Sequence, residues 1–112
     1  MCANSYSAAI EQYEQALALR EEYTDGSDVD NCLDIADLCD SLGCSCLNLQ
    51  SLAGYEKAEA YYNRGRYFIR QLQSQKDRLT DPENIKMAGE LMCSILGSLG
   101  LLYANQNNKC YF

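Results

Sequence analysis

Apolar residues recur along most of the chain at intervals of three and four positions, which is the period of one face of an α-helix. Four stretches carry this period, and short polar breaks separate them. The pattern predicts helices over residues 5–23, 28–53, 55–79 and 82–106. β-branched residues are few and never alternate with polar ones, so no strand is predicted. We therefore expect one all-α domain over residues 1–112, in which short links make neighbouring helices antiparallel hairpins.

Residues that favour helix starts stand before two of these stretches. Ser27 or Asp28 is placed to cap the second helix. Thr80 and Glu83 have the spacing of a capping box, and Pro82 between them suits the first helical position. The sequence therefore predicts sharp starts for the second and fourth helices.

Two predicted helix ends rest on residues that close or break helices. Gly54 is expected to end the second helix, because glycine adopts the left-handed conformation without steric cost. The polar run "NQNNK" over 105–109 is expected to break the fourth helix.

Each of the first three helices has one apolar face, and together these faces form the predicted core. The positions are Tyr6, Ala9, Ile10, Tyr13, Ala16 and Leu17 in the first helix, Cys32, Ile35, Ala36, Cys39, Leu42, Gly43, Cys46 and Leu49 in the second, and Tyr55, Ala58, Tyr62, Gly65, Ile69, Leu72 and Leu79 in the third.

The fourth predicted helix has two apolar sides that differ in size. An interior glycine costs a helix up to about 1 kcal/mol relative to alanine, so several glycines on one side indicate a packing demand. We expect the small side to let tyrosines of a neighbouring helix come close. The large side comprises Ile85, Met92, Ile95, Leu99 and Leu102, and the small side comprises Gly89, Cys93, Gly97, Gly100 and Ala104.

The chain repeats itself at helix level. An offset of 49 residues superposes tyrosines and small residues of the first helix on those of the third, and an offset of 54 superposes small residues of the second on those of the fourth. A repeat of this length is typical of stacked helical hairpins. The pairs are Tyr6 with Tyr55, Ala9 with Ala58, Tyr13 with Tyr62, Ala16 with Gly65, Cys39 with Cys93, Gly43 with Gly97, and Cys46 with Gly100.

These residues resemble a tetratricopeptide repeat, in particular the kinesin-light-chain type, whose second helix reads Y-x-x-A-x-x-x-Y-x-x-A-L-x-x-R. Residues 6–20, "YSAAIEQYEQALALR", match every marked place, whereas residues 55–69 lose the leucine and the arginine. "LGLLY" over 99–103 is similar to part of the family's first helix. The period of about 50 residues departs from the family's usual length of about 34.

The resemblance implies an α-solenoid that binds a peptide or protein segment on a concave face and has no catalytic activity, as a scaffold or adaptor does. The helix order further predicts a piece of a longer array, with helix 82–106 covered by further repeats or by self-association. The alternative is a self-contained four-helix bundle that self-associates and has a structural role.

The charge of the chain narrows the classes of partner. A net charge of −7 disfavours nucleic acid and anionic membranes, because both are bound by lysine and arginine. No run of 18 or more apolar residues is present, so no membrane span is predicted. The N-terminus lacks the basic and apolar regions of a secretory signal, and a cytoplasmic location is expected.

The seven cysteines are predicted to pack as small apolar residues in a reducing compartment. Cys44 and Cys46 diverge by about 200° on a helix, so they cannot bind one metal ion together. The chain has no histidine, which removes Ser-His and Cys-His nucleophile pairs. We expect no enzyme activity, no metal and no cofactor, although a thiol-based metal or redox protein is a third alternative.

Charge is unevenly distributed, which points to a candidate binding surface. Residues 11–40 contain ten acidic residues and one basic residue, whereas residues 57–86 contain seven basic residues and four acidic ones. One polar face of the second helix is a hypothetical groove for a basic or polar segment, and the alternative is that it is solvated or paired within the chain. The candidate partner-binding residues are Asp30, Asp34, Asp37, Ser41 and Asn48 on this face, and Arg64, Tyr67 and Arg70 on the third helix.

Overall fold

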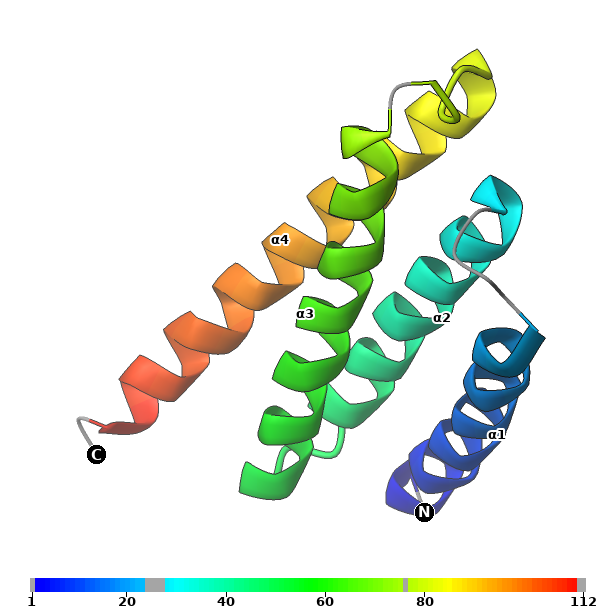
Figure 1. Cartoon of the computed structure of the whole chain (residues 1–112). Coiled ribbons are helices and arrows are strands. Elements are labelled where there is room, and N and C mark those ends of the chain that lie inside the picture. The colour runs from blue at the N-terminus through cyan, green and yellow to red at the C-terminus, as the bar shows by residue number, and fades with distance from the viewer. Residues whose placement is uncertain (1, 24–27, 76, 111–112) are drawn as a thin grey trace.

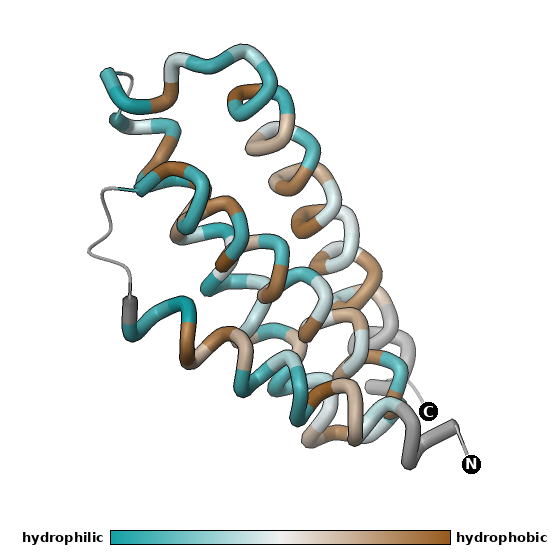
Figure 2. The backbone as a smooth tube through the Cα atoms, turned by 90° about the vertical axis from the view of Figure 1, so that its right-hand side faces the viewer, coloured by the Kyte–Doolittle hydropathy of each residue, from teal (hydrophilic) through white to brown (hydrophobic). Residues whose placement is uncertain are grey.

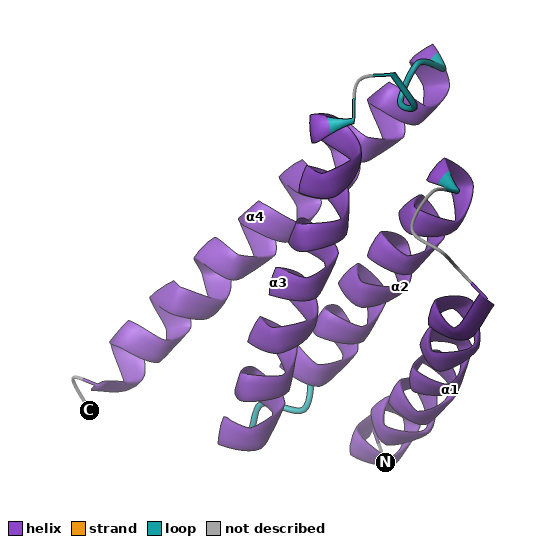
Figure 3. Ribbon diagram, viewed as in Figure 1, coloured by secondary structure: helices purple, strands orange, loops and turns teal. Residues whose placement is uncertain are grey.

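The computed structural model describes residues 2–23, 28–75 and 77–110, with side chains described for 6–22, 28–75 and 77–104. Within these ranges the chain forms helices only, joined by short loops (Figure 3), and the all-α prediction is confirmed. The helices are α1 (Cys2–Tyr23), α2 (Val29–Leu47), α3 (Leu52–Ser74) and α4 (Pro82–Cys110).

The helix α2 lies at the centre of an open arrangement. It packs against α1, α3 and α4, and α3 also packs against α4, whereas α1 and α4 do not meet in the described part of the chain. Figure 1 shows α1 and α4 on opposite sides of the molecule. The smallest dimension of the molecule is 19 Å, against a largest of 49 Å. Because a helix with its side chains is about 10 Å wide, the fold has two layers of antiparallel helices.

The core lies along α2 and α3, as the apolar pattern predicts. Tyr62, Ile69, Cys39 and Leu42 are fully buried there. Every predicted position of α2 and α3 from Cys32 to Leu72 is buried except Leu49, which is half-buried. Among the described side chains of α1, over residues 6–22, Ile10 and Leu17 are buried, and the remaining predicted positions, Tyr6, Ala9, Tyr13 and Ala16, are half-buried.

A tight turn joins α2 to α3, and it differs from the prediction. The helix α2 ends at Leu47, six residues before the predicted end, and Gln50 takes the left-handed conformation expected of Gly54, with φ 53°. The side chain of Ser51 then caps α3 by accepting a hydrogen bond from the Gly54 backbone N–H at 3.0 Å. Gly54 lies inside α3, where a Cβ would come within 2.6 Å of the Cys46 carbonyl oxygen. Its lack of a side chain therefore serves a close approach of two helices.

The other helix ends confirm some signals and correct others. The Asp28 side chain caps α2 by accepting from the Asn31 N–H, as predicted for one of two candidates. The helix α3 ends at Ser74 rather than at residue 79. Pro82 opens α4 as predicted, but the Asp81 carboxylate, not Thr80, accepts from the backbone of the first turn.

The predicted break over residues 105–109 is wrong, because α4 continues to Cys110. Asparagine and glutamine are only mildly unfavourable in a helix, and the run contains neither proline nor glycine. An established helix therefore continues through it.

Two glycines hold α2 and α3 close together. A Cβ on Gly43 would lie 2.6 Å from Cζ and 2.7 Å from Cδ1 of Tyr62, so the ring rests directly on the α2 backbone. A Cβ on Gly65 would lie 3.1 Å from the Cβ of Cys39. The prediction that small residues let tyrosines and neighbouring backbones approach is confirmed for this pair of helices.

Candidate functional site

One side of α4 is packed and the adjacent side is not. Ala88, Ile95 and Leu102 are fully buried among residues of α2 and α3, and Met92 packs against the same core. Ser94 on α4 also donates a hydrogen bond to the Asp40 carboxylate of α2 at 3.0 Å. These contacts fix how α4 is turned, and so they decide which of its residues stay uncovered.

The adjacent side, which we name the open face of α4, consists of the exposed residues Ile85, Cys93, Leu96, Gly97, Gly100 and Tyr103 and the half-buried Gly89. Tyr103, at its end, also hydrogen-bonds to Glu59 of α3. Ile85, Leu96 and Tyr103 keep 48%, 46% and 43% of their surface exposed. A Cβ added at any of the three glycines would meet no atom within 4 Å. In Figure 2 the α4 tube is largely brown and white over its middle turns.

The open face corrects the prediction for the small side of α4. That side is not contacted by any helix in the described part of the chain, and Cys93 is exposed. Ile85, which was predicted to join the core, is also exposed. The reason is geometric: α3 covers α2 on its small side, but no described helix takes the corresponding place beside α4.

The internal repeat relates the open face to a buried surface of the same protein. At an offset of 54 residues, the buried row of α2 that faces α3 falls on the open face of α4. Sequence reasoning missed Leu96, although this offset places it on Leu42, which is fully buried. The correspondences are Ile35 with Gly89, Ala36 with Glu90, Cys39 with Cys93, Leu42 with Leu96, Gly43 with Gly97, and Cys46 with Gly100.

The acidic candidates on α2 face solvent or α1. Asp30 and Asp37 are exposed, and Ser41 is half-buried. Asp34 accepts from the Arg20 guanidinium of α1 at 3.1 Å. Asn48 is the residue that ends α2, so its backbone N–H is used in the C-cap. The polar row exists as predicted, but part of it is paired within the chain.

The candidates on α3 do not join this acidic row. Arg64 forms an ion pair with Glu21 of α1. Tyr67 and Arg70 are exposed and lie together on the outer side of α3, where they line a shallow pocket with Asn63. The structure thus separates the predicted residues into three groups. The first is the acidic row on α2, the second is Arg64 in its contact with α1, and the third is Tyr67 and Arg70, which we name the basic edge of α3.

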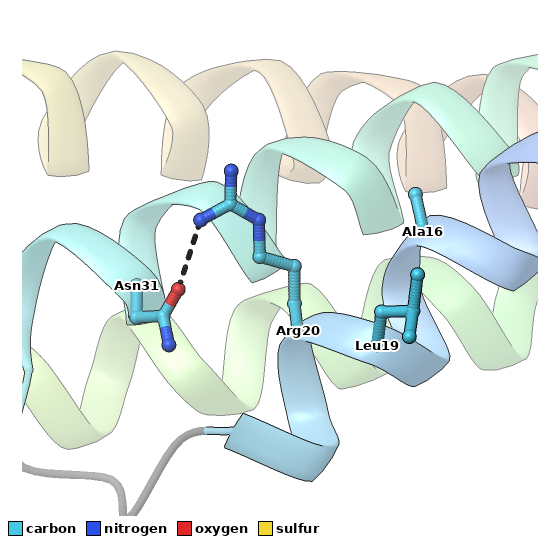
Figure 4. Close-up of a pocket in the computed structure, with 4 residues that line it drawn as sticks. All are labelled: Ala16, Leu19, Arg20 and Asn31. Atoms are coloured by element: carbon cyan, nitrogen blue, oxygen red, sulfur yellow. Dashed lines mark hydrogen bonds between the residues drawn. The ribbon is translucent and has the colours of Figure 1, made fainter.

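A second shallow pocket lies on the outer edge of α1. Ala16, Leu19, Arg20 and Asn31 line it, and Arg20 donates a hydrogen bond to the Asn31 side chain at 3.0 Å (Figure 4). Leu19 is exposed beside it. This edge of α1 is therefore partly apolar and open to contact.

The described cysteines have different surroundings. Cys32, Cys39 and Cys46 are buried, whereas Cys44 and Cys93 are exposed. Burial raises the pKa of Cys39 to about 12, and the nearby Arg64 offsets this only in part. Among the described residues, no group of three or more potential metal ligands comes together. The packing role predicted for cysteine thus holds for the buried three.

One helix of the described part, α4 over Pro82–Ala104, is long and apolar enough to cross a bilayer by length and composition. Core helices of soluble proteins pass the same test, so the finding is weak evidence. Here Ala88, Ile95 and Leu102 of this segment are fully buried by α2 and α3.

Comparisons with protein-family models, with curated proteins and with solved structures found no match to this chain. The resemblance to tetratricopeptide repeats therefore stays a prediction from the sequence.

Proposed function

We propose that this chain is a non-catalytic protein–protein interaction module of the tetratricopeptide-like kind. It acts as a cytoplasmic scaffold or adaptor and binds a protein segment on the open face of α4. One observation carries the proposal: Ile85, Leu96 and Tyr103 are exposed beside three glycines on a single side of one helix. Contiguous exposed apolar surface usually marks an interaction site.

The chemistry of the open face suits a helical partner. Full burial of a leucine or isoleucine side chain contributes roughly 1.5–3 kcal/mol, and about half of that remains available for Leu96, which is 46% exposed. The glycines add no side chain between the two backbones, so a partner helix can come close enough to cover Leu96 and Ile85 together. A partner with large apolar or aromatic residues at helical spacing fits this surface.

The acidic row of α2 supports a partner less well. Asp34 already pairs with Arg20, so a basic segment would have to compete for it. Peptide binding to a variant that combines Asp34→Lys with Asp37→Lys tests this row. Unchanged affinity for every bound segment would remove it from the binding surface.

The alternative of a self-contained four-helix bundle is less well supported. Such a bundle closes its core by packing its first and last helices together or across a shared centre. Here α1 and α4 lie on opposite sides of α2, and the apolar side of α4 stays open. The open order favours a surface that awaits a partner.

Site-specific photo-crosslinking tests the proposed function. A photoreactive phenylalanine analogue is placed at Leu96 in the full chain, in cells that naturally produce it, and at the exposed Gln73 of α3 as a matched control. We expect discrete protein adducts from position 96 and none from position 73. Equal adduct patterns at both positions would refute the proposal, as would crosslinks to lipid alone.

A further inference from the structure

We propose that the occupant of the open face of α4 is the helix α1 of a second copy of this chain, so that copies stack head to tail. The inference rests on the proposed function, because it names the partner of the same surface. The packing of α3 on α2 within one copy is the template for the packing of α1 on α4 between copies.

The two repeat offsets define the contact. Within one copy, the ring of Tyr62 rests on Gly43 and Gly65 approaches Cys39. Shifted by 49 residues, the α3 residues become Tyr13 and Ala16 of α1. Shifted by 54, the α2 residues become Gly97 and Cys93 of α4. The ring of Tyr13 from one copy thus falls on Gly97 of the next, where no atom lies within 4 Å in the single chain.

The α1 residues required for this contact keep part of their surface exposed in the described part of the chain. Ile10 and Leu17 hold α1 on the core and are buried. Tyr6, Ala9, Tyr13 and Ala16, which we name the tyrosine row, are only half-buried. Tyr13 also packs against the edge of the core, and Ala16 lines the pocket on the outer edge of α1.

The helices α1 and α3, which match at an offset of 49, each pack on the next helix of the chain through corresponding sides: α1 on α2, and α3 on α4. Ile10 of α1 corresponds to Glu59 of α3, and Glu59 accepts a hydrogen bond from Tyr103 of α4. Ile10 in turn lies on the side of α1 that packs on α2. The side of α1 that corresponds to the α2-facing side of α3 is therefore the tyrosine row, which is only half-buried in the single chain.

The charges on the two surfaces are complementary. Ile69 follows Tyr62 by two helical turns and Ala36 precedes Gly43 by two turns, so antiparallel packing sets them opposite each other. Their counterparts are Arg20 of α1 and Glu90 of α4, a basic and an acidic residue. Within the single chain Arg20 pairs with Asp34, and Glu90 pairs with Lys86. The Arg20 side chain is 50% exposed and that of Glu90 is 68% exposed, so both remain accessible between copies.

The polar edges beside this contact also match. Within one copy, Glu14 and Glu21 of α1 contact Tyr61 and Arg64 of α3. The offset of 49 residues takes Glu14 and Glu21 to Asn63 and Arg70 of α3, and it takes Tyr61 and Arg64 back to Gln12 and Gln15 of α1. Between copies, Asn63 and Arg70 of one therefore lie opposite Gln12 and Gln15 of the next. All four side chains are exposed, and no like charges oppose each other. The basic edge of α3 thereby joins the interface.

Such an interface uses two different surfaces, so it does not close on itself in a pair. Each copy offers the tyrosine row at one end and the open face of α4 at the other, and association continues as an open stack. A symmetric contact between two α4 helices would instead stop at a dimer.

Sedimentation velocity and light scattering over a range of protein concentrations test the inference, with two blocking variants. Gly97→Leu fills the place of the Tyr13 ring, in a position that has open space in the single chain. Ala16→Glu puts a charge into the tyrosine row. Lys57→Leu, at an exposed position of α3 outside both surfaces, is the matched control, and circular dichroism checks that each variant keeps its helices.

We expect the mean mass of the native chain and of Lys57→Leu to rise with concentration past that of a dimer. Each blocking variant alone should stay monomeric, and an equimolar mixture of the two should stop at a one-to-one dimer, because one intact surface remains on each. A mixture that stays monomeric would overturn the inference. A dimer lost in Gly97→Leu but kept in Ala16→Glu would do the same by showing symmetric contact through α4.

Protection of a native thiol gives a measurement without any variant. Cys93 lies in the proposed contact and is exposed in the single chain, while the exposed Cys44 lies outside it. We expect alkylation of Cys93 to slow by about tenfold or more as copies associate, with Cys44 unchanged. A native chain that remains monomeric while position 96 crosslinks to a different protein would overturn the inference and leave the proposed function standing.

Discussion

Exchange of single glycines for alanine distinguishes a glycine that is needed for a close contact from one that has open space beside it. Both Gly43 and Gly97 lie inside helices, so alanine at either position gains up to about 1 kcal/mol of helix propensity. At Gly97 the new methyl group meets nothing within 4 Å, and the full gain is expected. At Gly43 it meets the ring of Tyr62, which is fully buried and whose hydroxyl donates to the Cys44 sulfur at 3.3 Å.

A shift of the buried ring would disturb the core around it, and overpacking of this kind costs about 1–3 kcal/mol. Because the propensity gain is common to both variants, the difference between Gly97→Ala and Gly43→Ala measures the packing cost alone. We expect Gly97→Ala to be the more stable by about 1–3 kcal/mol in urea unfolding followed by circular dichroism, which corresponds to at least about 4 °C in Tm. Dilute protein keeps association out of the comparison.

The variant Tyr62→Leu provides the control for this comparison. Without the ring, the two alanine variants should differ by much less, because the contact that separates them is gone. Equal stability of Gly43→Ala and Gly97→Ala in the native background would refute the argument that Gly43 is a spacer for Tyr62.

Three further outcomes follow from the described contacts. Burial raises the pKa of Asp40, and a hydrogen bond from Ser94 offsets this only in part. Because the folded chain then holds a proton that the unfolded chain has lost, the native chain should lose stability as pH rises from about 4 through that raised pKa. Asp40→Asn should remove this loss, and its free energy of unfolding should equal that of the native chain at low pH. Urea unfolding at a series of pH values measures both, and the same pH dependence in the two proteins would contradict the prediction. Peptide mapping after alkylation at neutral pH should find Cys93 modified well before Cys39, whose pKa burial raises to about 12, and comparable rates would show that the core opens. Asp34→Asn should change the free energy of unfolding by less than about 1 kcal/mol, because the Asp34–Arg20 pair is about half exposed on both sides, and a larger loss in thermal unfolding would make it a structural contact.

The helices and the α2–α3 core could be predicted from periodicity, because burial of one face decides both. For α2 the predicted positions from Cys32 to Cys46 are all buried, although the buried Leu33 was left out, and Gly43 was assigned the right role. The ends were less predictable. Gly54 has the residue type that closes helices, but the Ser51 hydroxyl starts a new helix before Gly54, so a cap decides the boundary.

The candidate site was harder to predict than the core. The sequence shows that the small side of α4 resembles the small side of α2, but it cannot show whether another helix covers it. Gly97 and Gly43 have the same residue type and the same repeat position, yet one faces open space and the other a tyrosine ring. Likewise, the charge pattern could not reveal that Asp34 is held by Arg20, because that contact depends on how α1 lies on α2.

The central place of α2 also bears on the order in which the chain comes apart. Among the described residues of α1, Ile10 and Leu17 are buried, whereas α2 shares a buried surface with every other helix. Amide protons of α1 should exchange with deuterium through local detachment of that one helix, while those around Cys39 and Leu42 should exchange only when the whole molecule unfolds. Detachment of α1 would leave the α2–α3 hairpin and its Tyr62–Gly43 contact intact.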